Sequence, residues 1–150
     1  MWDFPRPPRL EAVTARVTVE TGGVLVADSL HALRVCETSS PPAYYLPRAD
    51  IRAELLEPSS RESFCEWKGV ARYWSLRAGG ELVVDAAWSY AEPEAPYIVL
   101  RDHLAFFAGR VGRCCVDGVA VNPQPGDYYG GWITPELVGP FKGEPGSEAW

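Results

Sequence analysis

The fold is decided by residues 13–27, which read VTARVTVETGGVLVA. Apolar and polar side chains alternate over residues 13–20, which is the pattern of a β-strand with one buried face. Gly22 and Gly23 follow and predict a tight turn, after which residues 24–27 return as the second arm of a hairpin. The first part of the chain is therefore predicted to be antiparallel β structure.

Further short strands are expected along the chain, separated by turns that contain Gly, Pro or Asp-Gly. Residues 48–56 are the one helix candidate, because Ile51 and Leu55 share a helical face and Pro58 ends the segment. Residues 38–47 contain three prolines and are expected to form a loop. These elements predict a mainly β fold of two antiparallel sheets with one short helix near residues 48–56. The expected strands beyond the first hairpin cover residues 33–37, 63–68, 71–77, 81–90, 103–107, 113–116 and 119–121.

Length and composition predict one domain over residues 1–150, with a Pro-rich extended arm at 1–9 and an irregular tail at 133–150. The formal net charge is −6 and the arginines are scattered, so no nucleic-acid partner is expected, because such partners require clustered cations. No apolar run is long enough for a membrane helix and the start does not read as a signal peptide. We therefore expect a cytoplasmic protein with no membrane association.

The four cysteines, Cys36, Cys65, Cys114 and Cys115, do not form a C-x-x-C pair. The usual spacing of a zinc site is therefore missing, and we expect neither a metal nor a cofactor. Cys114 and Cys115 are adjacent, so on a strand they would point to opposite faces.

Six segments resemble the motifs of a bacterial family catalogued as domain of unknown function 427: residues 2–8, 37–47, 65–69, 87–90, 129–132 and 139–143. The resemblance implies a fold similar to the β-tent superfold, in which two antiparallel sheets meet at an angle. That superfold includes methionine sulfoxide reductase B and the thalidomide-binding domain of cereblon. Some of its members bind zinc through two C-x-x-C pairs, which this chain lacks, and some hold ligands in an aromatic cage.

The chain departs from the family in two motifs. Members often have Ser-His-Pro-Pro where residues 39–42 read Ser-Ser-Pro-Pro, and Cys-Pro-Trp-Lys where residues 65–68 read Cys-Glu-Trp-Lys. A role for that histidine does not carry over. The family is also loosely labelled as nucleotidyltransferases, which bind metal–nucleotide complexes through paired carboxylates after a Gly-Ser turn. No such motif occurs in this sequence.

Three residues are candidates for catalysis. Glu37 continues an apolar stripe, where a carboxylate is costly unless it is paired, so it is either a general acid or base or part of a structural ion pair. Lys68 is one of only two lysines beside twelve arginines, which hints at a need for a compact ammonium. Cys65 is either a nucleophile or an inert buried thiol.

Six aromatic residues are candidates for ligand binding, and the alternative is that they form the core. Three hypotheses follow: a module that binds an unidentified small molecule in an aromatic pocket with Glu37 and Lys68 as polar anchors, an enzyme that uses Glu37, Lys68 or Cys65, or a protein-interaction domain. The aromatic candidates are Tyr44, Tyr45, Trp67, Trp74, Trp88 and Tyr90.

Overall fold

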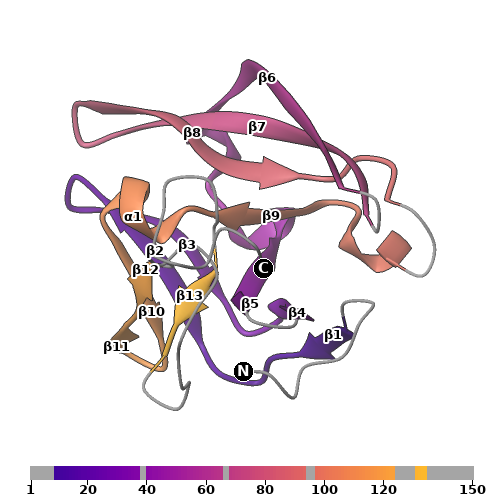
Figure 1. Ribbon diagram of the computed structural model, residues 1–150. Helices are drawn as coiled ribbons and strands as arrows, with labels where there is room; N and C mark the ends of the chain where they lie inside the picture. Colours follow the sequence, from indigo (N-terminus) through magenta and orange to yellow (C-terminus); the bar gives the residue numbers. More distant parts are fainter. Residues whose placement is uncertain (1–8, 38–39, 66–67, 94–96, 124–130, 135–150) are drawn as a thin grey trace, which may run out of the picture.

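Two antiparallel sheets, of seven and four strands, dominate the computed structural model, which describes residues 9–37, 40–65, 68–93, 97–123 and 131–134 (Figure 1). The larger sheet has the order β1-β4-β5-β9-β8-β7-β6 and the smaller one β11-β10-β2-β3, and a third ribbon pairs β12 with β13. The prediction of a mainly β, antiparallel fold is confirmed. The strands of the larger sheet are β1 (Arg9–Ala12), β4 (Leu33–Glu37), β5 (Ser40–Pro47), β6 (Leu56–Cys65), β7 (Gly69–Ala78), β8 (Glu81–Ser89) and β9 (His103–Phe106). The others are β2 (Val17–Thr21), β3 (Val24–Ser29), β10 (Arg113–Val116), β11 (Val119–Ala120), β12 (Asn122–Pro123) and β13 (Trp132–Ile133).

Two hairpins are closed by Gly-Gly pairs, as the sequence predicts. Gly22 and Gly23 join β2 to β3 with φ of 56° and 78°, and Gly79 and Gly80 join β7 to β8 with φ of 58° and 80°. Two successive positive φ values are typical of the type I′ turn, whose twist matches that of the strands it connects. The paired glycines therefore set the register of both hairpins.

The first core lies between the two sheets and contains Val17, Val19, Leu46, Leu104 and other buried side chains. The second core lies on the opposite face of the larger sheet and is richer in rings: Tyr45, Tyr73, Trp88, Tyr90, Tyr97 and Phe107 are buried there. The larger sheet is thus buried on both faces over its central strands. In Figure 1, β6, β7 and β8 lie along the top, while β9 crosses the middle of the molecule.

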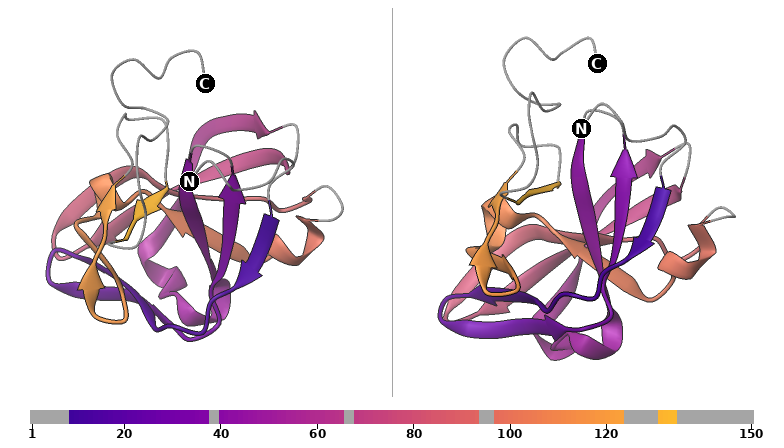
Figure 2. Two further views of the ribbon diagram at one scale, coloured as in Figure 1. Left: turned by 60° about the horizontal axis from the view of Figure 1, so that its bottom comes forward. Right: turned by 90° about the horizontal axis from the view of Figure 1, so that it is seen from below.

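The segment expected to be a loop at residues 38–47 is a strand over most of its length. β5 pairs with β4 on one side, but on the other side it pairs with β9 only from Tyr45 to Pro47. Pro41 and Pro42 lie where β5 has no β9 partner and next to a register shift in β4. A proline is tolerated at such a position because it removes no ladder hydrogen bond there. Figure 2 shows β1, β4 and β5 side by side.

The helix expected at residues 48–56 is replaced by two 3₁₀ turns, η1 (Arg48–Asp50) and η2 (Ala53–Leu55). Ile51 separates them and forms an isolated β-bridge with Ala27. So short a segment gains little from helix propagation, and one tertiary backbone contact is enough to interrupt it. A further 3₁₀ turn, η3, covers Tyr97–Leu100, and the one α-helix in the described part is α1, Ala108–Val111.

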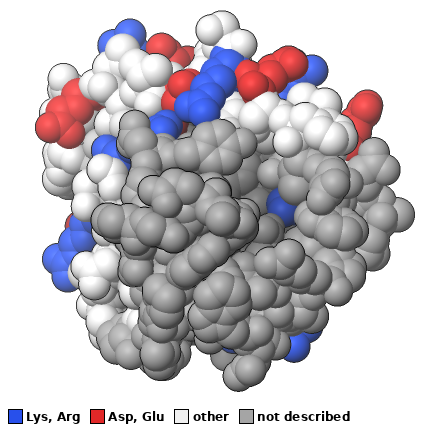
Figure 3. All heavy atoms as spheres, viewed as in Figure 1, with Lys and Arg blue, Asp and Glu red and all other residues white. Residues whose placement is uncertain are grey.

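Charges of both signs alternate along the upper edge of the face in Figure 3. Three ion pairs belong to β6, β7 and β8: Arg72 with Glu62, Arg77 with Glu57 and Arg61 with Asp85. Within the described ranges, no helix is both long and apolar enough to cross a membrane. Of the arm predicted at residues 1–9 and the tail predicted at 133–150, residues 1–8 and 135–150 lie outside the described residues, whereas Arg9 begins β1 and Ile133 ends β13.

Candidate ligand-binding site

The second core contains three of the aromatic residues that we predicted to bind ligand, Tyr45, Trp88 and Tyr90. The indole N–H of Trp88 donates a hydrogen bond of 3.0 Å to the hydroxyl of Tyr45. The ring of Trp88 also lies 4.6 Å from that of Phe107, centre to centre. Tyr45 and Trp88 are 1% and 8% exposed and line neither of the two pockets described below. These two rings are therefore part of the core, and their role in ligand binding stays a prediction.

Tyr44 and Tyr45 are adjacent in sequence, but their side chains lie on different faces of the larger sheet. Tyr45 belongs to the second core, whereas Tyr44 lies in the first core and stacks on Trp132 at 5.0 Å between ring centres. This separation is a consequence of strand geometry, since successive side chains point to opposite faces. The pair therefore cannot line one cavity together.

Lys68 lies in the turn between β6 and β7 and is 4% exposed. Its Nζ lies 6.0 Å from the centre of the Tyr90 ring, at the outer limit of a cation–π contact. The side chains of Glu37 and Cys65, and all of Trp67, lie outside the described residues. The catalytic hypothesis built on Glu37, Lys68 and Cys65 therefore stays a prediction.

A pocket of about 230 Å³ lies at the end of the larger sheet where β7, β8 and β9 meet. Its aromatic lining comes from Tyr73, Trp74 and Tyr90, two of which are predicted ligand-binding residues. We call it the Trp74 pocket. The indole N–H of Trp74 donates a hydrogen bond of 2.9 Å to the hydroxyl of Ser89, which fixes the ring as a wall.

Arg48 gives the Trp74 pocket its most available cation. The guanidinium lies over the Trp74 ring, 4.8 Å from its centre, and its side chain makes no hydrogen bond or ion pair with another described residue. The backbone N–H of Arg48 donates to the carbonyl of Asp102 over 2.7 Å, which anchors the start of η1. The stacked guanidinium is thus held in place with its N–H groups available.

Two further basic side chains line the same pocket. Arg72 is paired with Glu62 at 2.5 Å. His103 places Nδ1 at 2.9 Å from the carbonyl of Arg101, and because a carbonyl can only accept, Nδ1 is the protonated nitrogen. In neutral His103, Nε2 is then an acceptor.

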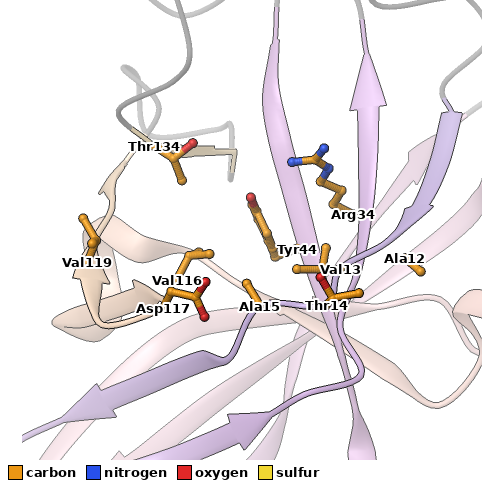
Figure 4. Close-up of a pocket in the computed structure, with 10 residues that line it drawn as sticks. All are labelled: Ala12, Val13, Thr14, Ala15, Arg34, Tyr44, Val116, Asp117, Val119 and Thr134. Carbon is orange, nitrogen blue, oxygen red and sulfur yellow. The ribbon is translucent and has the colours of Figure 1, made fainter.

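A second pocket, of about 460 Å³, lies between the edges of the two sheets, and we call it the Arg34 pocket (Figure 4). Arg34 on β4 and Tyr44 on β5 form one wall, and Asp117, at the turn after β10, forms the opposite wall. Thr134, which follows β13, closes the top in the view of Figure 4.

Arg34 belongs to a small polar network at the edge of the larger sheet. Its Nε donates to Oε1 of Glu11 over 2.7 Å, and Glu11 also accepts from Nη2 of Arg9 at 2.8 Å. Burial would lower the pKa of Arg34, but its hydrogen bonds with Glu11 and Tyr44 outweigh burial and raise it. The thiol of Cys36 lies 3.5 Å from Oε1 of Glu11. Burial, helped by the negative charge of Glu11, raises the pKa of Cys36 to about 11.

Cys36, Cys114 and Cys115 are free and buried. Burial also raises the pKa of the Cys114 thiol, with a smaller contribution from Cys115. A protonated thiol is a poor nucleophile, so neither Cys36 nor Cys114 is a candidate for covalent chemistry. No group of three or more His, Cys, Asp or Glu residues in the described ranges could hold a metal ion.

Sequence reasoning missed Arg48, His103, Arg34 and Thr134. In the sequence, Arg48 stands out only as the start of the expected helix, directly after the Pro-rich segment. The other three carry no local signal, because each becomes notable only through what it contacts, or fails to contact, in the folded chain.

The fold and the two pockets define a mainly antiparallel β domain with cavities of ligand size. A sequence model of the family described as a domain of unknown function (DUF427) matches residues 9–117. The chain belongs to this family, as its motifs predict. The match spans all residues named for the Trp74 pocket and ends before Thr134 of the Arg34 pocket. A comparison with curated proteins finds no match to this chain.

Proposed function

We propose that the protein binds a small anionic molecule with a planar ring in the Trp74 pocket. The observation that carries this proposal is the guanidinium of Arg48, which lines the pocket without a hydrogen bond or ion pair to any described residue. A partly buried cation is expected to have a partner. An anionic ligand would supply one.

The balance of charge in the pocket favours an anion. Arg48, Arg72 and His103 line it, and Asp102 is the one carboxylate among its described lining residues. Arg72 is already paired with Glu62, which leaves Arg48 as the open donor. A guanidinium offers parallel N–H groups whose spacing matches the two oxygens of a carboxylate or phosphate.

The aromatic lining and the volume favour a single ring. Tyr73, Trp74 and Tyr90 line the pocket, and an aromatic lining suits a planar ring. Pockets for drug-sized molecules measure roughly 300–1,000 Å³, so a pocket of about 230 Å³ fits one ring with one or two substituents.

Titration with benzoate, nicotinate and orotate, followed by calorimetry and tryptophan fluorescence, tests the proposal. We expect at least one to bind saturably, and Arg48→Gln to weaken it about tenfold or more, because a charge-assisted hydrogen bond contributes roughly 1.5–3 kcal/mol. Arg52→Gln is the matched control, since Arg52 is exposed and paired with Glu54 at 3.0 Å. Equal binding by the two variants, or no saturable binding of any of the three probes, would contradict the proposal.

A protein-interaction role is a second candidate, supported by two exposed side chains at the edge of the larger sheet. Phe64 and Val70 pair across β6 and β7 and are 70% and 45% exposed. Phe64 lies on the edge strand β6 and Val70 on the adjacent β7, and exposed apolar neighbours at a sheet edge favour contact with another chain. Sedimentation of the wild type and of Phe64→Ser over a range of concentrations tests this role. If the role is correct, the substitution removes any self-association seen in the wild type.

We also propose a cytoplasmic location. The free thiols of Cys36, Cys114 and Cys115 support it, because a reducing compartment keeps cysteines unpaired.

A further inference from the structure

Thr134 carries a buried hydroxyl that has no hydrogen-bond partner in the described part of the chain. The residue is 6% exposed, and its side chain makes no hydrogen bond with any described residue. The other described Ser and Thr residues of comparable burial are all bonded: Thr21 to the carbonyl of Val111, Ser29 to Asp50, Ser75 to Ser59 and Ser89 to Trp74. A buried polar group without a partner requires an explanation, because leaving it unpaired costs stability.

The hydroxyl of Thr134 lines the Arg34 pocket, and Figure 4 shows it on the same side as the ends of Tyr44 and Arg34. The Nε of Arg34 already donates a hydrogen bond to Glu11, and this contact orients the guanidinium. Three donor groups from three different strands or strand ends therefore converge at the top of the pocket. Such a cluster fits the two oxygens of a carboxylate.

The opposite wall has the opposite charge. The Oδ1 of Asp117 accepts a hydrogen bond of 2.9 Å from the backbone N–H of Arg16, and the carboxylate makes no ion pair with any described residue. Asp117 disfavours a second negative charge on the ligand and favours a cationic group. Between the walls, Val116, Val119 and Ala15 provide apolar surface.

We propose that the Arg34 pocket binds a zwitterionic α-amino acid with an apolar side chain. The carboxylate accepts hydrogen bonds from Arg34, Tyr44 and Thr134, the ammonium faces Asp117, and the side chain packs on Val116 and Val119. This site is separate from the Trp74 pocket, because the two share no lining residue, so either proposal can fail without the other.

Three matched probes separate the two charges of the ligand: L-leucine, 4-methylpentanoate, which lacks the amino group, and 3-methylbutylamine, which lacks the carboxylate. Binding is followed by ¹H–¹⁵N chemical-shift titration of the full chain at millimolar concentrations. We expect leucine to bind about tenfold more tightly than either analogue, as one lost ionic contact costs about that factor. The shifts should centre on Val116, Asp117 and Thr134.

Variants then assign each contact. Thr134→Val keeps the shape of the side chain but removes the hydroxyl. It should weaken the binding of leucine and 4-methylpentanoate and leave the binding of 3-methylbutylamine unchanged. Asp117→Asn should lower the affinity for leucine to that for 4-methylpentanoate. Thr18→Val, on β2 and outside the pocket, is the control.

Thr134→Val should fold at least as stably as the wild type, because the unpaired hydroxyl is removed, so lost binding cannot be ascribed to unfolding. Equal affinities for leucine and 4-methylpentanoate, unchanged leucine binding by Thr134→Val, or no shifts at these residues would each overturn the proposal.

Discussion

Gly22 and Gly79 meet backbone to backbone, although they belong to hairpin turns of different sheets. A Cβ built on Gly22 would lie 2.8 Å from the carbonyl oxygen of Ala78, and one built on Gly79 would overlap the carbonyl of Gly22. The β2–β3 turn and the β7–β8 turn therefore connect the two sheets at a point where no side chain fits.

We expect Gly79→Ala to lower the free energy of unfolding by more than about 2 kcal/mol. An L side chain at positive φ costs roughly 1–2 kcal/mol, and the methyl group must also displace the backbone of Gly22. Gly80→Ala is the control, because φ is 80° there as well but nothing lies within 4 Å of the added Cβ. Chemical denaturation measures both variants, and equal losses would show that the contact between the turns contributes nothing.

The hydrogen bond from Trp88 to Tyr45 is predicted to stabilise the second core. Tyr45→Phe leaves the buried indole N–H without this acceptor, at a cost of about 1–3 kcal/mol. A double-mutant cycle with Trp88→Phe isolates the pair from the other contacts of either ring, and we expect a coupling energy of about 1 kcal/mol. Additive losses would mean that the 3.0 Å contact does not stabilise the fold.

The hairpins could be predicted from the sequence because their signals are local. Gly22-Gly23 and Gly79-Gly80 specify positive φ by residue type, and alternation specifies the buried face. β5 could not be predicted in the same way, because whether Pro41 and Pro42 are tolerated depends on the point at which the neighbouring strand begins to pair. The helix expected at residues 48–56 does not form for a related reason, because the β-bridge between Ala27 and Ile51 interrupts the segment.

The candidate sites were predictable only in part. Trp74 and Tyr90 stand out as large rings on strands, and both line the Trp74 pocket. Arg48 and Thr134 matter because their side chains make no hydrogen bond or ion pair in the described part of the fold, which is a property of three-dimensional packing that residue spacing does not encode. Tyr44 and Tyr45 were expected together in a loop beside one aromatic pocket, whereas on β5 they point to opposite faces of the sheet.

The buried thiols of Cys36 and Cys114 are predicted to be unreactive in the native protein. Burial raises the pKa of both, that of Cys36 to about 11, so almost no thiolate is present at neutral pH. In a Cys65→Ser background, labelling by a disulfide reagent should be slow and should accelerate with denaturant as unfolding does. Rapid labelling of Cys36 in buffer would contradict this prediction.

The ion pair between Glu11 and Arg34 predicts a pH dependence of stability. The hydrogen bond from Arg34 lowers the pKa of Glu11, against the opposing effect of burial, and the charges of Arg34 and Arg9 lower it further. A carboxylate whose pKa is lower in the folded state adds stability above its unfolded pKa, and that stability is lost as the pH falls through the folded pKa.

The Glu11→Gln variant should therefore be less stable than wild type at neutral pH. The difference should shrink as the pH falls below the ordinary range of glutamate and vanish once Glu11 is protonated in both states. Urea denaturation from neutral pH to about pH 3 measures the difference. A gap that stays constant over this range would mean that Glu11 stabilises the edge of the sheet by its shape and hydrogen bonds, with no contribution from its charge.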